Sequence, residues 1–167
     1  MRFYKSRNVL APKRAHSKDA GIDFFIPEFT KEFKKDFKEK NLLSYINNYG
    51  KNEHISIPAN GRVLIPSGLH VSLPHEYALI AFNKSGVATK KGLDILASVV
   101  DETYQGEIHL SLSNTTDTPV QLLPNEKVVQ FILIHMNYLN PIEIETLEKL
   151  YPEKTKRGVG GFGSTGQ

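Results

Sequence analysis

The chain has 167 residues, which suits one domain with a sizeable core, and its 40% hydrophobic and 23% charged content is ordinary for a globular protein. It contains no cysteine, which excludes disulfides, thiolate metal sites and cysteine nucleophiles. The net charge of +3 and the pI of about 9.0 leave three explanations open. They are attraction to a polyanion such as nucleic acid, attraction to a small anion such as a nucleotide, and a merely lysine-rich composition.

The N-terminal segment "MRFYKSRNVLAPKR" lacks the apolar stretch of a signal peptide, and no apolar run approaches membrane-spanning length. We therefore expect a cytoplasmic protein without membrane contact. The lysine-rich composition suits a phage or an AT-rich bacterium, and a phage-encoded protein would work in the host cytoplasm.

The first distinct element is a helix within residues 29–54. Three rings recur every four residues with lysine and glutamate between them, which places them on one helix face: Phe29, Phe33 and Phe37. An apolar cluster follows at 42–46 (Leu42, Leu43, Tyr45, Ile46), and Gly50 could end it. We interpret the segment as an amphipathic insertion that packs on a β-domain. The alternative is an arm that binds a protein partner or nucleic acid.

From about Ile55 onward the sequence predicts short strands. Apolar and polar residues alternate in "HISIPANGRVLIPSGLHVSLP", which turn residues interrupt. The pattern continues in "YALIAF", "LASVV", "EIHLSLSN", "PVQLL" and "VVQFILIHM". Such spacing favours an antiparallel sandwich or barrel, and no internal repeat or long linker indicates a second domain.

Between two of these strands, "FNKSGVATKKG" offers groups that suit phosphate. Lys84 supplies a positive charge, Ser85 a hydroxyl donor, and Gly86 lets backbone N–H groups approach an anion. Such triplets also occur by chance, so this one does not identify a site by itself.

"VVDETYQGE" places Asp101 directly after an apolar strand and before a hairpin-like turn. A carboxylate there is either a turn-former or a general base that takes a proton from water. The six histidines are scattered, so a protein-ligated zinc site is not expected; His70 and His109 lie in strand patterns, where the surface is the default. No Gly-x-Ser-x-Gly elbow supports a hydrolase triad.

The C-terminal "RGVGGFGSTGQ", from Arg157 to Gln167, combines an arginine, glycines and two hydroxyls. It lacks the Gly-Lys-Ser/Thr ending of a Walker loop. By its composition alone it is a disordered tail.

These segments occur in a fixed order, and in that order they resemble the five motifs of the trimeric deoxyuridine triphosphate nucleotidohydrolases (dUTPases). "DAGIDFFIP" at Asp19–Pro27 is similar to the first motif. The second to fifth have counterparts in "NKSGVATKKG", "VVDETYQGE", "NEKVVQFIL" and "RGVGGFGSTG". Each match is weak alone, but five in order over nearly the whole chain are specific.

The resemblance implies an all-β, distorted jelly-roll-like barrel or sandwich for residues 1–156, with the helical insertion at about 29–54. Residues 157–167 would form a mobile arm, disordered without ligand, that closes over the active site. The implied assembly is a homotrimer in which three subunits build each site.

The implied activity is hydrolysis of dUTP to dUMP and pyrophosphate, which keeps uracil out of DNA and supplies dUMP for thymidylate synthesis. Asp101 is expected to deprotonate the water that attacks the α-phosphorus. The hairpin from Ser98 through Val100 to Tyr104 would hold uracil through backbone groups, with Tyr104 stacked under the deoxyribose. Asp23 would organise the site rather than act in the chemistry.

Further residues are implied as phosphate and lid contacts. Lys84, Ser85 and Gly86 would touch phosphates, with Gln130 nearby. In the arm, Arg157 would meet the γ-phosphate and Phe162 would cover uracil, while Ser164 and Thr165 would donate to phosphate oxygens. Gly163 would also belong to the substrate-binding residues. Mg²⁺ is the expected cofactor, held by the substrate phosphates and water with no direct protein ligand.

Three departures from the family pattern stand out. Lys84 replaces the usual arginine, which removes bidentate geometry and leaves a point charge. Ser98 replaces a common glycine of the hairpin, and the 29–54 insertion matches no motif. None of these alters Asp101, so activity is expected to survive.

Two other functions remain open. A dCTP deaminase, or a bifunctional deaminase–dUTPase, shares the fold, although "KSG" and "FGSTG" argue against it. A non-catalytic nucleotide-sensing module could use the basic insertion to bind a partner, because fold alone does not decide function.

Overall fold

The computed structural model describes residues 1–47 and 53–160, and strands dominate it. Its strands are β1 (Arg2–Lys5), β2 (Ile22–Phe25), β3 (Tyr45–Asn47), β4 (His54–Ile57), β5 (Arg62–Pro66), β6 (Leu69–Ser72), β7 (Tyr77–Asn83), β8 (Leu93–Ala97), β9 (Val99–Val100), β10 (His109–Asn114), β11 (Val120–Leu122) and β12 (Lys127–His135). Its helices are α1 (Lys31–Lys40), α2 (Ser85–Lys91) and α3 (Leu147–Leu150). The all-β prediction is confirmed.

The chain divides into two compact units, residues 1–137 and 138–167. All the strands above, with α1 and α2, belong to the first unit. The second contains α3, whose N-cap Thr146 accepts a hydrogen bond from the Lys149 N–H at 3.3 Å. The expected start of the arm at residue 157 lies inside this second unit.

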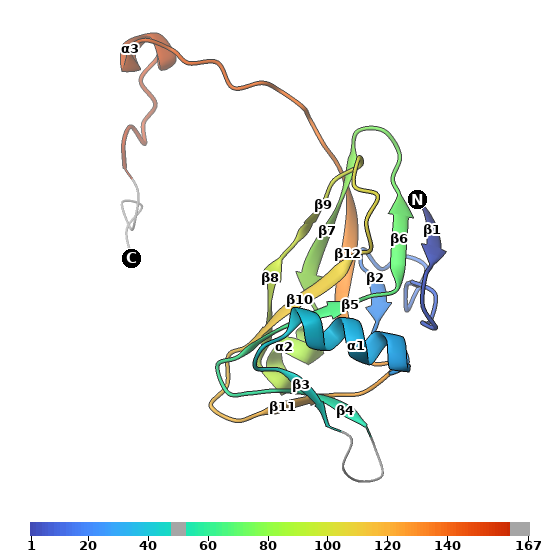
Figure 1. Cartoon of the computed structure of the whole chain (residues 1–167). Helices are drawn as coiled ribbons and strands as arrows, with labels where there is room; N and C mark the ends of the chain where they lie inside the picture. The colour runs from blue at the N-terminus through green and yellow to red at the C-terminus, as the bar shows by residue number, and fades with distance from the viewer. Residues whose placement is uncertain (48–52, 161–167) are drawn as a thin grey trace. The chain divides into compact units, whose positions relative to one another are not determined.

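The strands of the first unit pair antiparallel in four small sheets. Their strand orders are β2-β12-β7-β9, β5-β10-β8, β11-β4-β3 and β1-β6. In the described part of the chain none of these sheets closes into a barrel. The long strands β7 and β12 run side by side through the unit (Figure 1).

The core follows the period-two pattern that the sequence predicts. Along β10, Leu110, Leu112 and Asn114 are buried while His109 is only half-buried, since alternate side chains point to opposite faces. The largest fully buried side chains come from both strands and helix: Phe24, Phe33, Phe37, Ile26, Ile55, Ile57, Ile65, Leu69, Leu79, Ile108, Leu110 and Leu112.

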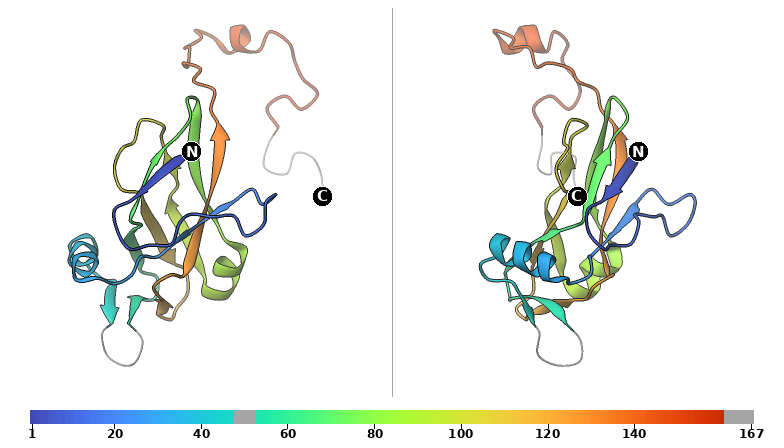
Figure 2. Two further views of the ribbon diagram at one scale, coloured as in Figure 1. Left: turned by 90° about the vertical axis from the view of Figure 1, so that its right-hand side faces the viewer. Right: turned by 45° about the vertical axis from the view of Figure 1, so that its right-hand side comes forward.

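The helix expected in the 29–54 insertion is present as α1, which lies against one side of the strands (Figure 2). Thr30 caps it, accepting a hydrogen bond from the Phe33 N–H at 3.2 Å. Phe33 and Phe37 are fully buried, and Phe29, just before the cap, stacks on Phe33 with 5.3 Å between ring centroids. The predicted apolar face therefore packs into the core, as the amphipathic interpretation requires.

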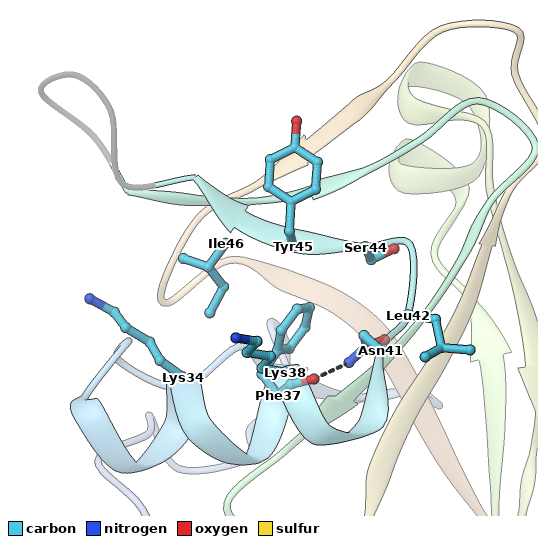
Figure 3. Close-up of a pocket in the computed structure, with 8 residues that line it drawn as sticks. All are labelled: Lys34, Phe37, Lys38, Asn41, Leu42, Ser44, Tyr45 and Ile46. Atoms are coloured by element: carbon cyan, nitrogen blue, oxygen red, sulfur yellow. Dashed lines mark hydrogen bonds between the residues drawn. The ribbon is translucent and has the colours of Figure 1, made fainter.

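The apolar cluster that follows α1 differs from a second buried helix face. Leu42 and Leu43 are exposed, and Tyr45–Asn47 forms β3, which pairs with β4. Asn41 holds the turn, because its side-chain amide donates to the Phe37 carbonyl at 2.8 Å (Figure 3) and its oxygen accepts from the Leu64 N–H. Gly50 lies outside the described residues.

Candidate active site

Asp23, which the sequence predicts to organise the site, is buried between two lysines. Its carboxylate accepts hydrogen bonds from the Nζ atoms of Lys84 and Lys127, the latter at 3.0 Å. Burial by itself would raise the pKa of Asp23, but the two lysines outweigh it and hold the pKa below its ordinary value. Asp23 is therefore an anion at neutral pH and orients two cations at one end of the sheet.

Lys127 was not predicted. It is the third residue of the fourth motif, but no local pattern links it to Asp23, from which it is 104 positions distant. Only the antiparallel pairing of β2 with β12 brings the two side chains together.

The same pairing places Gln130 opposite Asp23. The Gln130 side chain donates to the Asn83 carbonyl at 2.8 Å, directly before Lys84. Gly21 makes room for it, because a Cβ at Gly21 would lie 2.2 Å from Gln130 Oε1. The first, second and fourth motifs thus lie next to one another. The first motif has a glycine at position 21 because a side chain there would collide with Gln130.

Ser85 and Gly86 form the first turn of α2, after Lys84 at the N-cap. The first N–H groups of a helix have no acceptor within it, so they are suited to bind an anion. A Cβ at Gly86 would meet nothing within 4 Å, so this turn faces open space. Lys84, which pairs with the Asp23 carboxylate, lies directly before it.

The segment predicted as a hairpin, for which we keep that name, lines a cavity of about 170 Å³. Its strand β9 pairs with β7 and not with β10, the strand that follows the turn, so it is not a β-hairpin in the strict sense. Four of the predicted residues line it: Ser98, Val100, Asp101 and Tyr104. The side chains of Ile108 and Phe131 contribute apolar wall. Val99 and Val100 pair with β7, and the Ser98 carbonyl accepts from the Ala81 N–H at 2.7 Å, which ties the hairpin to the sheet.

A tight turn follows Asp101. The Tyr104 N–H donates to the Asp101 carbonyl at 3.1 Å, and the Tyr104 hydroxyl donates to the Glu107 carbonyl at 2.9 Å. A Cβ at Gly106 would lie 2.4 Å from the Tyr104 hydroxyl oxygen, so any side chain there would displace the ring. The turn thus fixes Tyr104 at the cavity, where the residue remains 44% exposed.

His109 is not the surface residue that its strand position suggested. It is half-buried and lines the hairpin cavity. Burial lowers its pKa despite the nearby Glu107. Its Nδ1 lies 2.9 Å from the Glu107 carbonyl, which can only accept, so the neutral ring carries its proton on Nδ1. The surface expectation failed because the hairpin covers this face of β10.

The two groups of predicted residues lie at different ends of β7. Val100 pairs with Leu79, so Asp101 continues toward Ala78, whereas Lys84 follows the far end of the strand. At ~3.3 Å per residue the backbone separation is roughly 20 Å. Figure 1 shows β9 and α2 correspondingly far apart along β7.

The predicted arm residues are only partly described. In the second unit, Arg157 Nε donates to the Gly160 carbonyl at 2.9 Å. The other arm residues lie outside the described residues: Phe162, Gly163, Ser164 and Thr165.

Within residues 1–47 and 53–160, no group of three or more His, Asp or Glu side chains is arranged to hold a metal ion. Over the same residues, no helix is long and apolar enough to cross a membrane.

A larger hollow, of about 320 Å³, lies between α1 and β3 (Figure 3). None of the predicted site residues lines it. A neighbouring hollow of about 450 Å³ beside Arg62 likewise contains none of them. The hairpin cavity is smaller, but it alone among these three carries the predicted chemistry.

The sequence profile of the dUTPase family matches residues 51–166. A deoxyuridine 5'-triphosphate nucleotidohydrolase of Fusobacterium nucleatum is 33% identical over 69% of this chain and 77% of the relative. The enzymes of the same name from Paramecium bursaria Chlorella virus 1 and Yarrowia lipolytica are 38% and 40% identical, over 68% of this chain and 77% and 71% of theirs.

Solved structures show the same fold. The Staphylococcus bacteriophage 80alpha dUTPase with dUPNHPP has a TM-score of 0.75 at 18% identity, covering 99% of this chain and 98% of that one. The phage phi11 dUTPase, described with a species-specific insert, has a TM-score of 0.67 at 17% identity, covering 88% and 97%. A further phi11 structure concerns a structural Mg(II) ion.

Proposed function

This chain belongs to the dUTPase family and hydrolyses dUTP, and we propose that Asp101 is the base that activates the attacking water. The cavity lined by Ser98, Val100, Asp101 and Tyr104 is the observation that carries this assignment. It offers backbone groups that can hydrogen-bond a nucleobase, the Tyr104 ring that can pack against a sugar, and the Asp101 carboxylate at the same turn. The expected products are dUMP and pyrophosphate, released by attack at the α-phosphorus.

We propose that the opposite end of β7 binds the phosphate chain. Lys84 and the first turn of α2 supply a cation, a hydroxyl and backbone N–H groups. Asp23 holds Lys84 in place instead of reacting, and Gln130 is bonded next to it. Charge develops on the departing pyrophosphate, so cations fixed here stabilise the transition state.

Mg²⁺ fits this arrangement as a substrate-bound ion. Magnesium usually binds through one or two carboxylates, substrate phosphates and water. When bound, the ion neutralises charge on the triphosphate oxygens. Phosphate contacts by Ser85 and Gly86 would then complete the binding of the chain.

We further propose that the enzyme is a homotrimer with shared active sites. Asp101 and Lys84 of one chain lie roughly 20 Å apart along β7, a long span for groups that act on one triphosphate. Combining the hairpin of one chain with the phosphate end of another removes this difficulty. Residues 157–167 would then close over the site as an arm, with Arg157 on the γ-phosphate and Phe162 over uracil.

The base assignment is tested by measuring pyrophosphate release from dUTP for the wild type and for Asp101→Asn. Loss of a general base costs about 10²- to 10⁴-fold in rate. Full activity in the variant would refute the role of Asp101. An inactive wild type would instead favour a nucleotide-sensing module, and ammonia release from dCTP would favour a deaminase; the named relatives favour neither.

Subunit mixing tests the shared site. Asp101→Asn chains and Lys84→Ala chains are each inactive alone in this scheme. If different chains supply the two residues, random mixing restores roughly a quarter of the sites, because each role is then filled independently. If one chain supplies both, mixing restores nothing.

A chain ending before Arg157 should stay trimeric yet lose most of its turnover. A cytoplasmic location stays a prediction.

A further inference from the structure

Arg7 joins three parts of the first unit that are distant in sequence. Its Nε and Nη2 atoms donate to the two carboxylate oxygens of Glu107 at 2.7 and 3.0 Å. Nη2 also donates to Asp36 of α1 at 2.6 Å. The guanidinium carbon lies 6.0 Å from the ring centroid of Phe33, also in α1. We call Arg7, Asp36 and Glu107 the Arg7 cluster.

Two members of the Arg7 cluster, Arg7 and Glu107, are largely shielded from water. The side chains of Arg7 and Glu107 are 12% and 15% exposed, so their paired hydrogen bonds are weakly screened. Glu107 also accepts from the Gly68 N–H at 2.7 Å. Burial would raise the pKa of Glu107, but the bonds from Arg7 and Gly68 outweigh it and lower the pKa. Glu107 therefore remains an anion held from two sides.

The backbone of Glu107 connects this cluster to the hairpin cavity. Its carbonyl accepts from the Tyr104 hydroxyl at 2.9 Å and from His109 Nδ1 at 2.9 Å. Both donors line the cavity. A shift of Glu107 would therefore move the acceptor on which the position of the Tyr104 ring depends.

We propose that the Arg7 cluster positions Tyr104, so that the helical insertion contributes through Asp36 and Phe33 to selection of deoxyribose over ribose. This inference rests on the proposed function, in which Tyr104 lies against the sugar. Arg7, Asp36 and Glu107 are positioning residues: they act through the Glu107 carbonyl and do not touch the substrate. The insertion thereby gains a role at the site although it matches no family motif.

The test compares kcat and KM for dUTP and for UTP in Arg7→Met, which keeps an unbranched apolar stem but loses the charge. The ratio of the two kcat/KM values should fall roughly threefold to tenfold, the range of one net hydrogen bond. Asp36→Asn, which leaves the Arg7–Glu107 bonds in place, should lower the ratio less. Arg2→Met is the matched control, because Arg2 is an exposed residue of β1 whose guanidinium donates to the Ser72 hydroxyl, and it should leave the ratio unchanged.

A double-mutant cycle separates positioning from a general structural effect. Tyr104→Phe removes the hydroxyl that donates to the Glu107 carbonyl. If Arg7 acts through that hydroxyl, Arg7→Met lowers the ratio in the wild type but not in the Tyr104→Phe background. An equal loss in both backgrounds overturns the proposal, and so does an unchanged ratio in Arg7→Met. Should Arg7→Met fail to fold, Glu107→Gln, which keeps the side-chain shape, takes its place with the same two outcomes.

Hydrogen exchange keeps this inference separate from the proposed function. Backbone amides of residues 101–109 should exchange faster in Arg7→Met than in Arg2→Met, whether or not dUTP is hydrolysed. Equal exchange overturns the inference alone. An inactive wild type with the expected exchange difference overturns the proposed function and leaves the Arg7 cluster as the support of the turn, without a role in selecting the sugar.

Discussion

The two ends of β7 are built in different ways. At the Lys84 end, the decisive contacts form within one sheet, where Asp23 lies buried between Lys84 and Lys127. At the hairpin end, Asp101 and Tyr104 are exposed, and the turn that carries them is supported from outside by Arg7 and α1. The first arrangement depends on strand register; the second depends on ion pairs with segments that no motif includes.

This difference indicates where the enzyme can vary. Register is strongly specified by burial, because a one-residue slip would move every side chain to the opposite face. The phosphate end therefore has little freedom. The hairpin end can be tuned by its external supports, which in the proposed scheme gives the helical insertion influence on the sugar.

The largest expected effect on stability comes from truncating Phe33, the ring of α1 that packs against Arg7. Phe33→Ala should lower the free energy of unfolding by about 3–5 kcal/mol, because a fully buried ring leaves a cavity beneath Arg7. Urea unfolding at one protein concentration measures it. Lys35→Ala, on the exposed face of α1, should change it by less than about 0.5 kcal/mol. A loss near that of the control would show that α1 is dispensable to the core.

At the other end of β7, Asp23→Asn should lower the free energy of unfolding by about 1–3 kcal/mol, since Lys84 and Lys127 lose a buried anion. Asp117→Asn serves as the control, because Asp117 is an exposed carboxylate in the turn between β10 and β11. Asp23→Asn should also raise KM for dUTP, while the ratio of kcat/KM for dUTP to that for UTP stays unchanged. Altered selectivity would contradict the separation of the two ends.

Substitutions of two glycines, Gly21 and Gly86, test the proposed phosphate-binding end of β7. Gly21→Ala should cost about 1 kcal/mol and displace Gln130, because its Cβ would lie 2.2 Å from Gln130 Oε1. Gly86→Ala meets no atom within 4 Å and lies in a helix, so stability should be equal or higher by up to about 1 kcal/mol. If phosphate approaches this backbone, Gly86→Ala nevertheless raises KM. An unchanged KM would remove Gly86 from the binding site.

The smallest effect is a pH dependence at the hairpin end. Because burial lowers the pKa of His109, the unfolded chain binds the proton first as the pH falls below the ordinary histidine value. Stability should therefore decline gently there, before the deeper loss at acidic pH as Asp23 and Glu107, whose pKa values are lowered, take up protons. Urea unfolding across a pH series measures both steps.

His109→Gln should remove the first step and leave the second, since glutamine can still donate to the Glu107 carbonyl without titrating. The same mild slope in this variant would assign the first step to another group.

Much of the fold was predictable from local pattern. Period-two alternation identified the strands from β4 to β12, and four-residue spacing placed the rings of α1 on one face. The order of the motifs was sufficient to identify the family. Where a segment lacked such a pattern, prediction failed: β1 was missed, and the cluster at 42–46 proved to be an exposed turn followed by β3.

The sequence by itself determined the strands from β4 to β12, the helix α1, the family and the candidate base Asp101, because periodicity and motif order are properties of neighbouring residues. The tertiary structure decided which charges meet. Arg7 and Glu107 are 100 positions apart, and Lys127 and Asp23 are 104 apart. No local signal connects such pairs, since strand register and helix packing bring them together only when the chain folds. For the same reason His109, read as a surface residue in sequence, lies half-buried at the cavity.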